Sequence, residues 1–291
     1  MIKYTIKNLA RILSHSLFLS TFARLICMYR ANDRNHHISK NGELNLIKFL
    51  AQSDLFFLSK QSFTKQKKDY FFDVGANVGD YSKFLHYYFI NKSAATDREI
   101  FAFEPSLDNM KKIKKHKLNN INLINCAVSN KNSKMPFFKN KNRLSSGTDS
   151  LFDMNTIGYE SKYKKKYIKT ITLDDFCLKN KINMIKFLKI DIEGAEFSCL
   201  QGSRGLLKKS AIDIIQFEFG HAARANRVYL LDIIRLLKKY NYYTYALKPR
   251  KLEKIIYTPF VENRYNMANF VSFQDRLLPV MKSIIGKYEE F

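Results

Sequence analysis

Apolar and polar positions alternate along the chain in a pattern that predicts repeated strands and helices. The predicted strands are 70–74, 99–103, 121–128, 167–171, 184–190, 212–219, 242–247 and 269–273. The predicted helices between them and before them are 43–58, 79–90, 107–118, 195–202 and 226–240. This alternation predicts an α/β fold with a mostly parallel sheet and helices on both faces. Ligands of such sheets bind at the carboxyl ends of the strands.

Two polar segments interrupt the alternation. Residues 131–165 are polar and basic, and they predict a loop or hairpin insertion of the kind that often contacts substrates. Its cations, Lys139, Lys141, Arg143 and Lys162–Lys166, either select an acidic substrate or form a solvated loop. Residues 31–40 are predicted as a linker. We therefore divide the chain into an extension (1–40), a main domain (41–275) and a tail (276–291).

Residues 1–30 combine helical apolar spacing with five basic side chains. The charges interrupt the ~20 apolar residues that a membrane span requires. No small-residue cleavage site follows the apolar stretch 17–23, which argues against a secretory signal. Two interpretations stay open: the helix packs on its own domain, or it lies on an anionic membrane.

The charge balance is strongly basic, with 50 Lys and Arg against 26 Asp and Glu in 291 residues, a net charge of +24. An anionic partner such as nucleic acid, phospholipid, an acidic glycan or a phosphorylated donor fits this surplus, and so does a Lys-rich coding bias. The four cysteines form no C-x-x-C motif, which predicts a protein of the reducing cytoplasm. Cys126, inside an apolar run, is predicted to be a buried free thiol.

The strongest local motif covers residues 71–82, where an apolar strand ends in Asp73 and two glycines follow. Gly75 allows a close backbone approach, Gly79 allows tight packing, and the following helix start offers free N–H groups. The motif is neither G-x-G-x-x-G nor a Walker sequence, so NAD and ATP are disfavoured.

A second acid, Glu104, ends the next predicted strand. A carboxylate there can accept hydrogen bonds from ribose hydroxyls, while Asp73 suits the amino group of an amino acid. S-adenosylmethionine carries both groups. The alternative is that both acids are solvent-facing strand ends.

A third acidic group follows the predicted strand 184–190 and comprises Asp191, Glu193 and Glu196. Strand alternation places Lys189 and Asp191 on one side. The two glutamates also suit the first turn of a helix. A fourth strand end adds Glu218 and His221.

Five motifs, in order, resemble the FkbM family of methyltransferases. They are D-V-G-A-N-x-G from Asp73, F-x-F-E-P ending at Pro105, N-x-A-V-S from Asn125, T-L-D-D-F from Thr172 and K-I-D-I-E-G-A-E from Lys189. Asn41-Gly42-Glu43 also resembles the family's first segment, so the resemblance covers roughly 41–275.

The resemblance implies a Rossmann-like class I methyltransferase fold, with a seven-stranded sheet whose last strand is antiparallel. It implies S-adenosylmethionine as donor and O-methylation of sugars or natural products. By motif position, Asp73, Gly75, Asn77 and Gly79 form the donor loop, Glu104 binds the ribose, and Ala127 lies near the adenine. Asp191 would face the reactive methyl group.

Transfer to a hydroxyl needs a proton acceptor, and the candidates are Asp191, Glu193, Glu218 and His221. His221 is alternatively a polar loop residue. Asp191 with Glu193 or Glu218 could instead bind Mg²⁺, although we assign no metal site.

The expected partner is a glycan or small-molecule acceptor, with peripheral contact to an anionic membrane at its inner surface. Nucleic-acid methylation is the alternative, but the adenine-type Asn-Pro-Pro-Tyr run and the cytosine-type Pro-Cys pair are missing from the sequence. A non-catalytic Rossmann module is the second alternative.

Overall fold

The computed structural model describes residues 16–53, 68–91, 97–140, 149–152, 163–258, 265 and 267–286. Most of the predicted insertion's centre, the first 15 residues and the last five lie outside these ranges. The predictions made for those residues therefore remain predictions.

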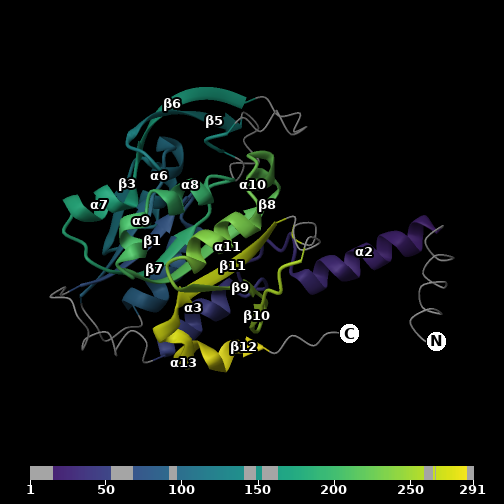
Figure 1. Cartoon of the computed structure of the whole chain (residues 1–291). Coiled ribbons are helices and arrows are strands. Elements are labelled where there is room, and N and C mark those ends of the chain that lie inside the picture. Colours follow the sequence, from purple (N-terminus) through teal and green to yellow (C-terminus); the bar gives the residue numbers. More distant parts are fainter. Residues whose placement is uncertain are drawn as a thin grey trace.

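The main sheet has the strand order β12-β10-β9-β11-β8-β7-β1-β2-β3 (Figure 1). The five neighbouring strands β3, β2, β1, β7 and β8 run parallel to one another. Strand β11 is antiparallel to both β8 and β9. Their bounds are β1 Asp69–Val74, β2 Arg98–Phe103, β3 Ile121–Ile124, β7 Ile185–Ile190, β8 Ile212–Gly220, β9 Tyr242–Leu247, β10 Leu252–Lys254, β11 Met267–Gln274 and β12 Ile285–Gly286. The antiparallel last strand is confirmed. The sheet exceeds the seven expected strands because β10 and β12 extend it beyond β9.

Helices cover both faces of this sheet, because successive strand residues point to opposite sides. Phe72 faces a core formed with α7 (Leu173–Lys179), α8 (Glu196–Gln201), α9 (Arg204–Lys208) and α11 (Leu230–Lys238). Phe71 faces the other core, formed with α3 (Glu43–Gln52), α5 (Asp80–Leu85), η2 (His86–Asn91) and α13 (Leu278–Met281). The remaining short elements are α6 Leu107–Lys115, α10 His221–Ala225, η5 Asp275–Leu277 and η6 Lys282–Ile284.

A second, three-stranded sheet has the order β4-β6-β5, with bounds β4 Ala127–Val128, β5 Ser133–Asn140 and β6 Tyr163–Ile171. The prediction of one strand over 121–128 was wrong, because the chain leaves the main sheet after β3. The Asn125 amide donates to the carbonyls of Glu104 and Pro105, 3.0 and 3.1 Å away, and this fixes the turn. The predicted hairpin is confirmed in its arms, because β5 pairs antiparallel with β6.

The helix α2 (Leu17–Ala31) projects away from the body of the molecule (Figure 1). The segment after it is not a free linker at its start, because Asn32 and Asp33 are buried. The Asn32 amide donates to the carbonyls of Asn41 and Leu247, 2.7 and 3.0 Å away. Among the described helices, none combines the length and the apolar content needed to cross a bilayer.

Candidate active site

A cavity of about 570 Å³ opens at the carboxyl ends of β2, β1, β7 and β8. The chain order changes direction between β1 and β7, which is where sheets of this type bind ligands. Seven residues predicted from the sequence line the cavity: Gly75, Asn77, Glu104, Ala127, Asp191, Glu193 and Glu218. The ends of β2 and β8 lie three strand spacings apart, roughly 14 Å.

The loop after β1 forms the floor of the cavity. Gly75 has φ +90°, and a Cβ there would lie 1.8 Å from the carbonyl oxygen of Asp191. Only glycine allows this close approach of two strand ends. Gly79 has φ +88° but lies outside the cavity lining, where it packs against Ile113 of α6. Its contribution is therefore to the packing of the loop.

Glu104 is buried at the end of β2 and lines the cavity. Its carboxylate accepts hydrogen bonds from the backbone N–H groups of Asn77 (2.8 Å) and Ser106 (2.7 Å). A carboxylate has about four lone-pair sites, so both oxygens can still accept a bond from a ligand hydroxyl. Burial raises the pKa of Glu104 to about 7, although the two backbone bonds oppose this.

An apolar pocket adjoins Glu104. It is lined by Phe103, Cys126, Ala127, Val128, Phe137 and Leu151. Cys126 is a buried free thiol, as the sequence predicted. Apolar walls next to a hydrogen-bonding acid suit a nucleoside, with its base in the pocket and its ribose at the acid.

Asp73 does not face the cavity, contrary to the expectation that it meets a ligand amino group. It is 1% exposed and accepts a hydrogen bond from the Ser82 hydroxyl at 2.5 Å. The difference follows from strand alternation, which turns the Asp73 side chain under α5 rather than toward the cavity. Burial raises the pKa of Asp73 to about 6, although the Ser82 bond opposes this.

A buried polar row lies beneath the cavity floor. Asp73, Lys189 and Gln216 are register partners across β1, β7 and β8. The Lys189 ammonium lies 3.1 Å from the Asp191 carboxylate and 3.4 Å from that of Glu43. The predicted proximity of Lys189 and Asp191 is confirmed, and it links the cavity to the start of α3.

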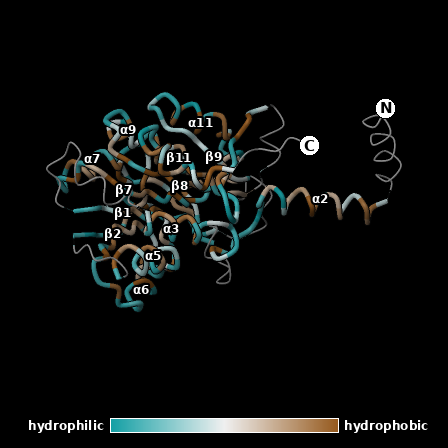
Figure 2. Tube along the Cα trace, turned by 90° about the horizontal axis from the view of Figure 1, so that it is seen from below, coloured by the Kyte–Doolittle hydropathy of each residue, from teal (hydrophilic) through white to brown (hydrophobic). Residues whose placement is uncertain are grey.

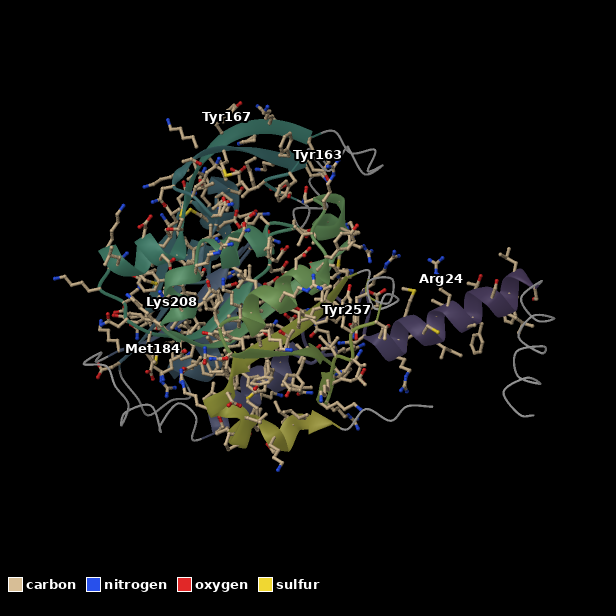
Figure 3. The ribbon with its side chains drawn as sticks, viewed as in Figure 1. Arg24, Tyr163, Tyr167, Met184, Lys208 and Tyr257 are labelled. Atoms are coloured by element: carbon tan, nitrogen blue, oxygen red, sulfur yellow. The ribbon has the colours of Figure 1, made fainter. Side chains whose placement is uncertain are left out.

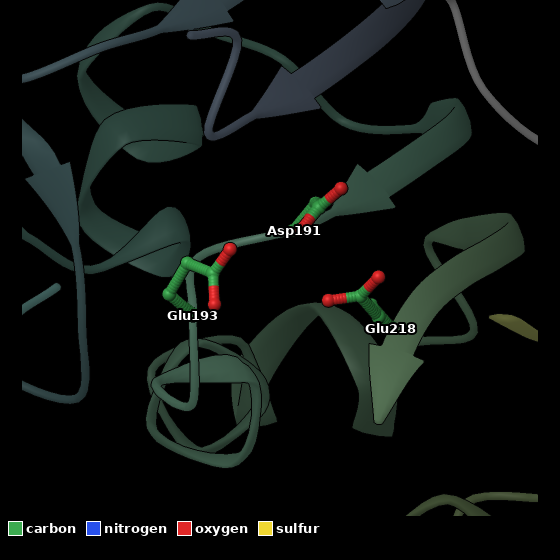
Figure 4. Close-up of side chains that lie close together, drawn as sticks. All are labelled: Asp191, Glu193 and Glu218. Atoms are coloured by element: carbon green, nitrogen blue, oxygen red, sulfur yellow. The ribbon is translucent and has the colours of Figure 1, made fainter. Parts of the chain in front are cut away.

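Three carboxylates converge in the cavity, from Asp191, Glu193 and Glu218 (Figure 4). One oxygen of each lies within 4.8 Å of the others. We call these three residues the acid triad. Burial, and then the charge of Asp191, raise the pKa values of Glu193 and Glu218 well above the ordinary range. Because like charges this close repel one another, each ionised carboxylate of the triad makes ionisation of its neighbours less favourable.

The other two candidates of this region have different positions. Glu196 is 2% exposed, and its carboxylate accepts from the N–H groups of Ile192 (3.0 Å) and Gly194 (3.2 Å), which shapes the loop after β7. His221 does not line the main cavity but lies in a small neighbouring hollow with Glu193 and Glu218.

Sequence reasoning missed several residues around the cavity. The Ser150 hydroxyl donates to the Glu193 carbonyl at 2.7 Å, and Asp149 and Ser150 both line the cavity. His36, from the predicted linker, and Met267 line it as well. No local pattern marks these residues, because they reach the site from distant parts of the chain.

A family model described as the methyltransferase FkbM domain matches residues 73–243, more than half of the chain. The chain belongs to the FkbM family of methyltransferases. It is therefore an S-adenosylmethionine-dependent methyltransferase with a Rossmann-like fold, and both sequence predictions are confirmed. No curated protein matches the chain.

Solved methyltransferase structures are similar at low identity. SMU.1697c of Streptococcus mutans, solved with SAH, is 10% identical, with 80% of this chain and 98% of that chain covered and a TM-score of 0.38. Fibrillarin of Aeropyrum pernix, solved with S-adenosyl-L-methionine, is 10% identical over 78% and 76% of the chains, with a TM-score of 0.37. All these TM-scores lie below 0.5, so the family match and the strand order define the fold of this FkbM protein.

Proposed function

We propose that this FkbM protein transfers a methyl group from S-adenosylmethionine to a hydroxyl of a sugar, glycan or glycolipid. The observation that carries the proposal is that Glu104 and the acid triad line one cavity, at its two ends. One end suits a nucleoside and the other suits removal of a proton.

The residues of this chain fit the donor at the β1 and β2 ends of the cavity. Glu104 would accept bonds from the ribose hydroxyls, and the apolar pocket around Ala127 would hold the adenine. The backbone of Gly75 and Asn77 would lie along the amino-acid chain of the donor. The donor supplies a methyl group that its positive sulfur already activates, so the protein must align the acceptor and exclude water.

The acid triad would remove the proton of the acceptor hydroxyl. Lys189 neutralises Asp191 from below, at 3.1 Å, while Glu193 and Glu218 have raised pKa values because of burial and the charge of Asp191. A general base contributes about 10²–10⁴-fold to such a reaction. We assign this role to Glu193 and Glu218. Asp191 would keep their two carboxylates in position. His221, in the neighbouring hollow, is the reserve candidate.

Magnesium binding is the alternative use of the acid triad. Its three oxygens match the ligand type that Mg²⁺ takes, and a bound cation would acidify the hydroxyl. Lys189 already supplies a positive charge beside Asp191, which favours the proton-acceptor role. Dialysis against EDTA should therefore leave methyl transfer unchanged, and a loss that added Mg²⁺ restores would establish the metal role instead.

A nucleic-acid acceptor is the second candidate, supported by the outer face of the β5–β6 hairpin. Lys134, Lys165 and Lys169 share this face with Phe138 and Tyr167. Tyr167 is exposed on the hairpin (Figure 3). Cations and rings together suit a nucleic-acid strand, and they suit an acidic glycan equally. We favour the glycan, and we place the reaction in the cytoplasm at the inner membrane surface.

The test uses the full chain with labelled S-adenosylmethionine and separate pools of glycans, glycolipids and RNA. We expect label in a carbohydrate fraction, with a mass increase of one methyl group on a hydroxyl. Glu218→Gln should lower kcat by about 10²-fold or more while donor binding stays intact. Label that enters only RNA would overturn the proposed acceptor.

A further inference from the structure

Helix α2 exposes an unusual amount of apolar surface. It carries seven of the fourteen large hydrophobic residues that are exposed in the described part of the chain. Leu17, Phe18 and Tyr29 are 83%, 77% and 83% exposed, and only Ala31 at the end of the helix is buried. The helix stands clear of the body (Figures 1 and 2). Exposed apolar patches of this kind mark a surface that is covered in use.

Four of the exposed apolar residues of α2 form one face. Phe18, Phe22, Leu25 and Tyr29 follow one another at spacings of four, three and four residues. Such residues share one side of a helix, and Ser20, Arg24 and Cys27 then fall on the opposite side. A helix with one apolar and one polar, basic face suits the boundary between lipid headgroups and acyl chains.

The charge of residues 1–31 indicates which kind of surface would cover α2. Residues 1–31 contain five basic residues and no acidic residue. Arg24 lies on α2 away from the body of the molecule (Figure 3). A second copy of the chain would bring like charges together. Anionic lipid headgroups complement them, and each basic residue near such a surface contributes about 1 kcal/mol.

The end of α2 is joined firmly to the wall of the active-site cavity. The Lys248 ammonium donates to the Ala31 carbonyl at 2.7 Å and so caps the helix end. Asp33 and Arg34, which follow the helix end, form hydrogen bonds with the backbone of Met267. The Asp33 carboxylate accepts from the Met267 N–H at 2.6 Å, and the Arg34 N–H donates to the Met267 carbonyl at 2.8 Å.

Met267 and the exposed His36 both line the cavity, and Met267 lies near its Glu218 end. Met267 pairs with Gly220, two residues beyond Glu218. The anchored helix therefore ends beside the part of the cavity that would take the acceptor.

We propose that α2 lies in the interface of an anionic membrane and holds the acceptor side of the cavity against the lipid surface. The acceptor is then the headgroup hydroxyl of a glycolipid or lipid-linked sugar. The identity of the acceptor rests on the proposed function, whereas membrane binding does not.

The test measures sedimentation of the full chain with vesicles of phosphatidylcholine alone, or mixed with phosphatidylglycerol. We expect binding to the mixed vesicles that weakens with added salt. Phe18→Ser with Phe22→Ser should weaken it about tenfold or more, which corresponds to about 1.4 kcal/mol. Ser20→Ala with Cys27→Ser, on the opposite face, is the matched control and should bind as the wild type does.

Several outcomes would overturn the proposal. They are equal binding by the Phe18 and Phe22 variant, absence of binding by the wild type, or an α2-dependent dimer that ignores vesicles. Thermal unfolding should be unchanged in both double variants, because the substituted side chains contact solvent. If the chain binds vesicles but methylates no acceptor, the proposed function fails and membrane binding stands.

Discussion

Glu104 shows how burial makes donor binding depend on pH. Its pKa is raised to about 7 by burial, so the side chain is mostly protonated below this pH and ionised above it. Only the ionised form offers two acceptor oxygens and a negative charge to a cationic donor. At the residue scale, the affinity for the donor should therefore increase as the pH rises through about 7.

The substitution Glu104→Gln tests this dependence. We expect donor affinity to fall about tenfold or more, equivalent to about 1.4 kcal/mol, and the remaining affinity to lose most of its pH dependence. Calorimetric titration with S-adenosylmethionine between mildly acidic and mildly basic pH measures both effects. Asp80→Asn, at an exposed acid that begins α5, is the control and should leave both effects unchanged.

Lys189 is the second residue whose role depends on burial. It is 2% exposed and lies between the carboxylates of Asp191 and Glu43. Burial alone would lower the pKa of Lys189, but these two carboxylates outweigh burial, so its pKa is raised. Lys189 thus remains charged and offsets the charge of both acids.

Lys189→Met should lower the free energy of unfolding by about 3–5 kcal/mol, because it leaves the buried Glu43 carboxylate and the partly exposed Asp191 without this cationic partner. Adding Glu43→Gln should restore part of this loss, since one of those charges is then removed. Urea unfolding of the two single variants and the double variant measures the coupling. Strictly additive effects would contradict the pairing.

At the scale of elements, the β5–β6 hairpin contains an unfavourable pair of like charges that strand packing does not explain. Lys134 lies directly opposite Lys169 across the two strands, and both are exposed. Like charges in this arrangement destabilise a sheet. The arrangement is consistent with a hairpin that meets an anionic acceptor.

Lys169→Glu should therefore stabilise the free protein by about 0.2–1 kcal/mol in low salt. The gain should disappear in high salt, where the charges are screened. Thermal unfolding at two salt concentrations measures this. Lys208→Glu, on α9 and away from the hairpin, controls for the change in net charge (Figure 3).

One of the family motifs, T-L-D-D-F from Thr172, acts on the packing of elements rather than on the ligand. The Thr172 hydroxyl accepts from the Asp175 N–H at 3.1 Å and caps α7. The Asp174 carboxylate accepts from the N–H groups of Gly205 and Leu206, 2.7 and 2.8 Å away, at the start of α9. This motif was predictable as a helix start, but the partners of Asp174 at the start of α9 were not.

At the scale of the whole molecule, several buried acids share one effect on stability. Burial raises the pKa of Asp73 to about 6 and that of Glu196 to about 7, as it does for Glu104. The unfolded chain releases these protons near its ordinary pKa values, about 4. The native state therefore holds more protons between about pH 4 and pH 7, and its stability falls as the pH rises through this window.

We expect the Tm of the unliganded protein to fall by several degrees between pH 5 and pH 8, since 1 kcal/mol corresponds to roughly 2–4 °C in large domains. Differential scanning calorimetry measures the slope. Asp73→Asn should reduce it by removing one contributor, whereas Asp80→Asn should not. A Tm that rises over the same interval in both the wild type and Asp73→Asn would contradict this account.

The sequence by itself determined the main strands, the glycine loop and the ends at which ligands bind, because apolar periodicity and turn residues act locally. Only the tertiary structure decided that Asp73 faces inward, that His36 and Met267 reach the cavity, and that Gln216 meets Glu43, 173 residues away. A side chain's partners depend on which distant strands and helices cover it, and local sequence patterns carry no information about that.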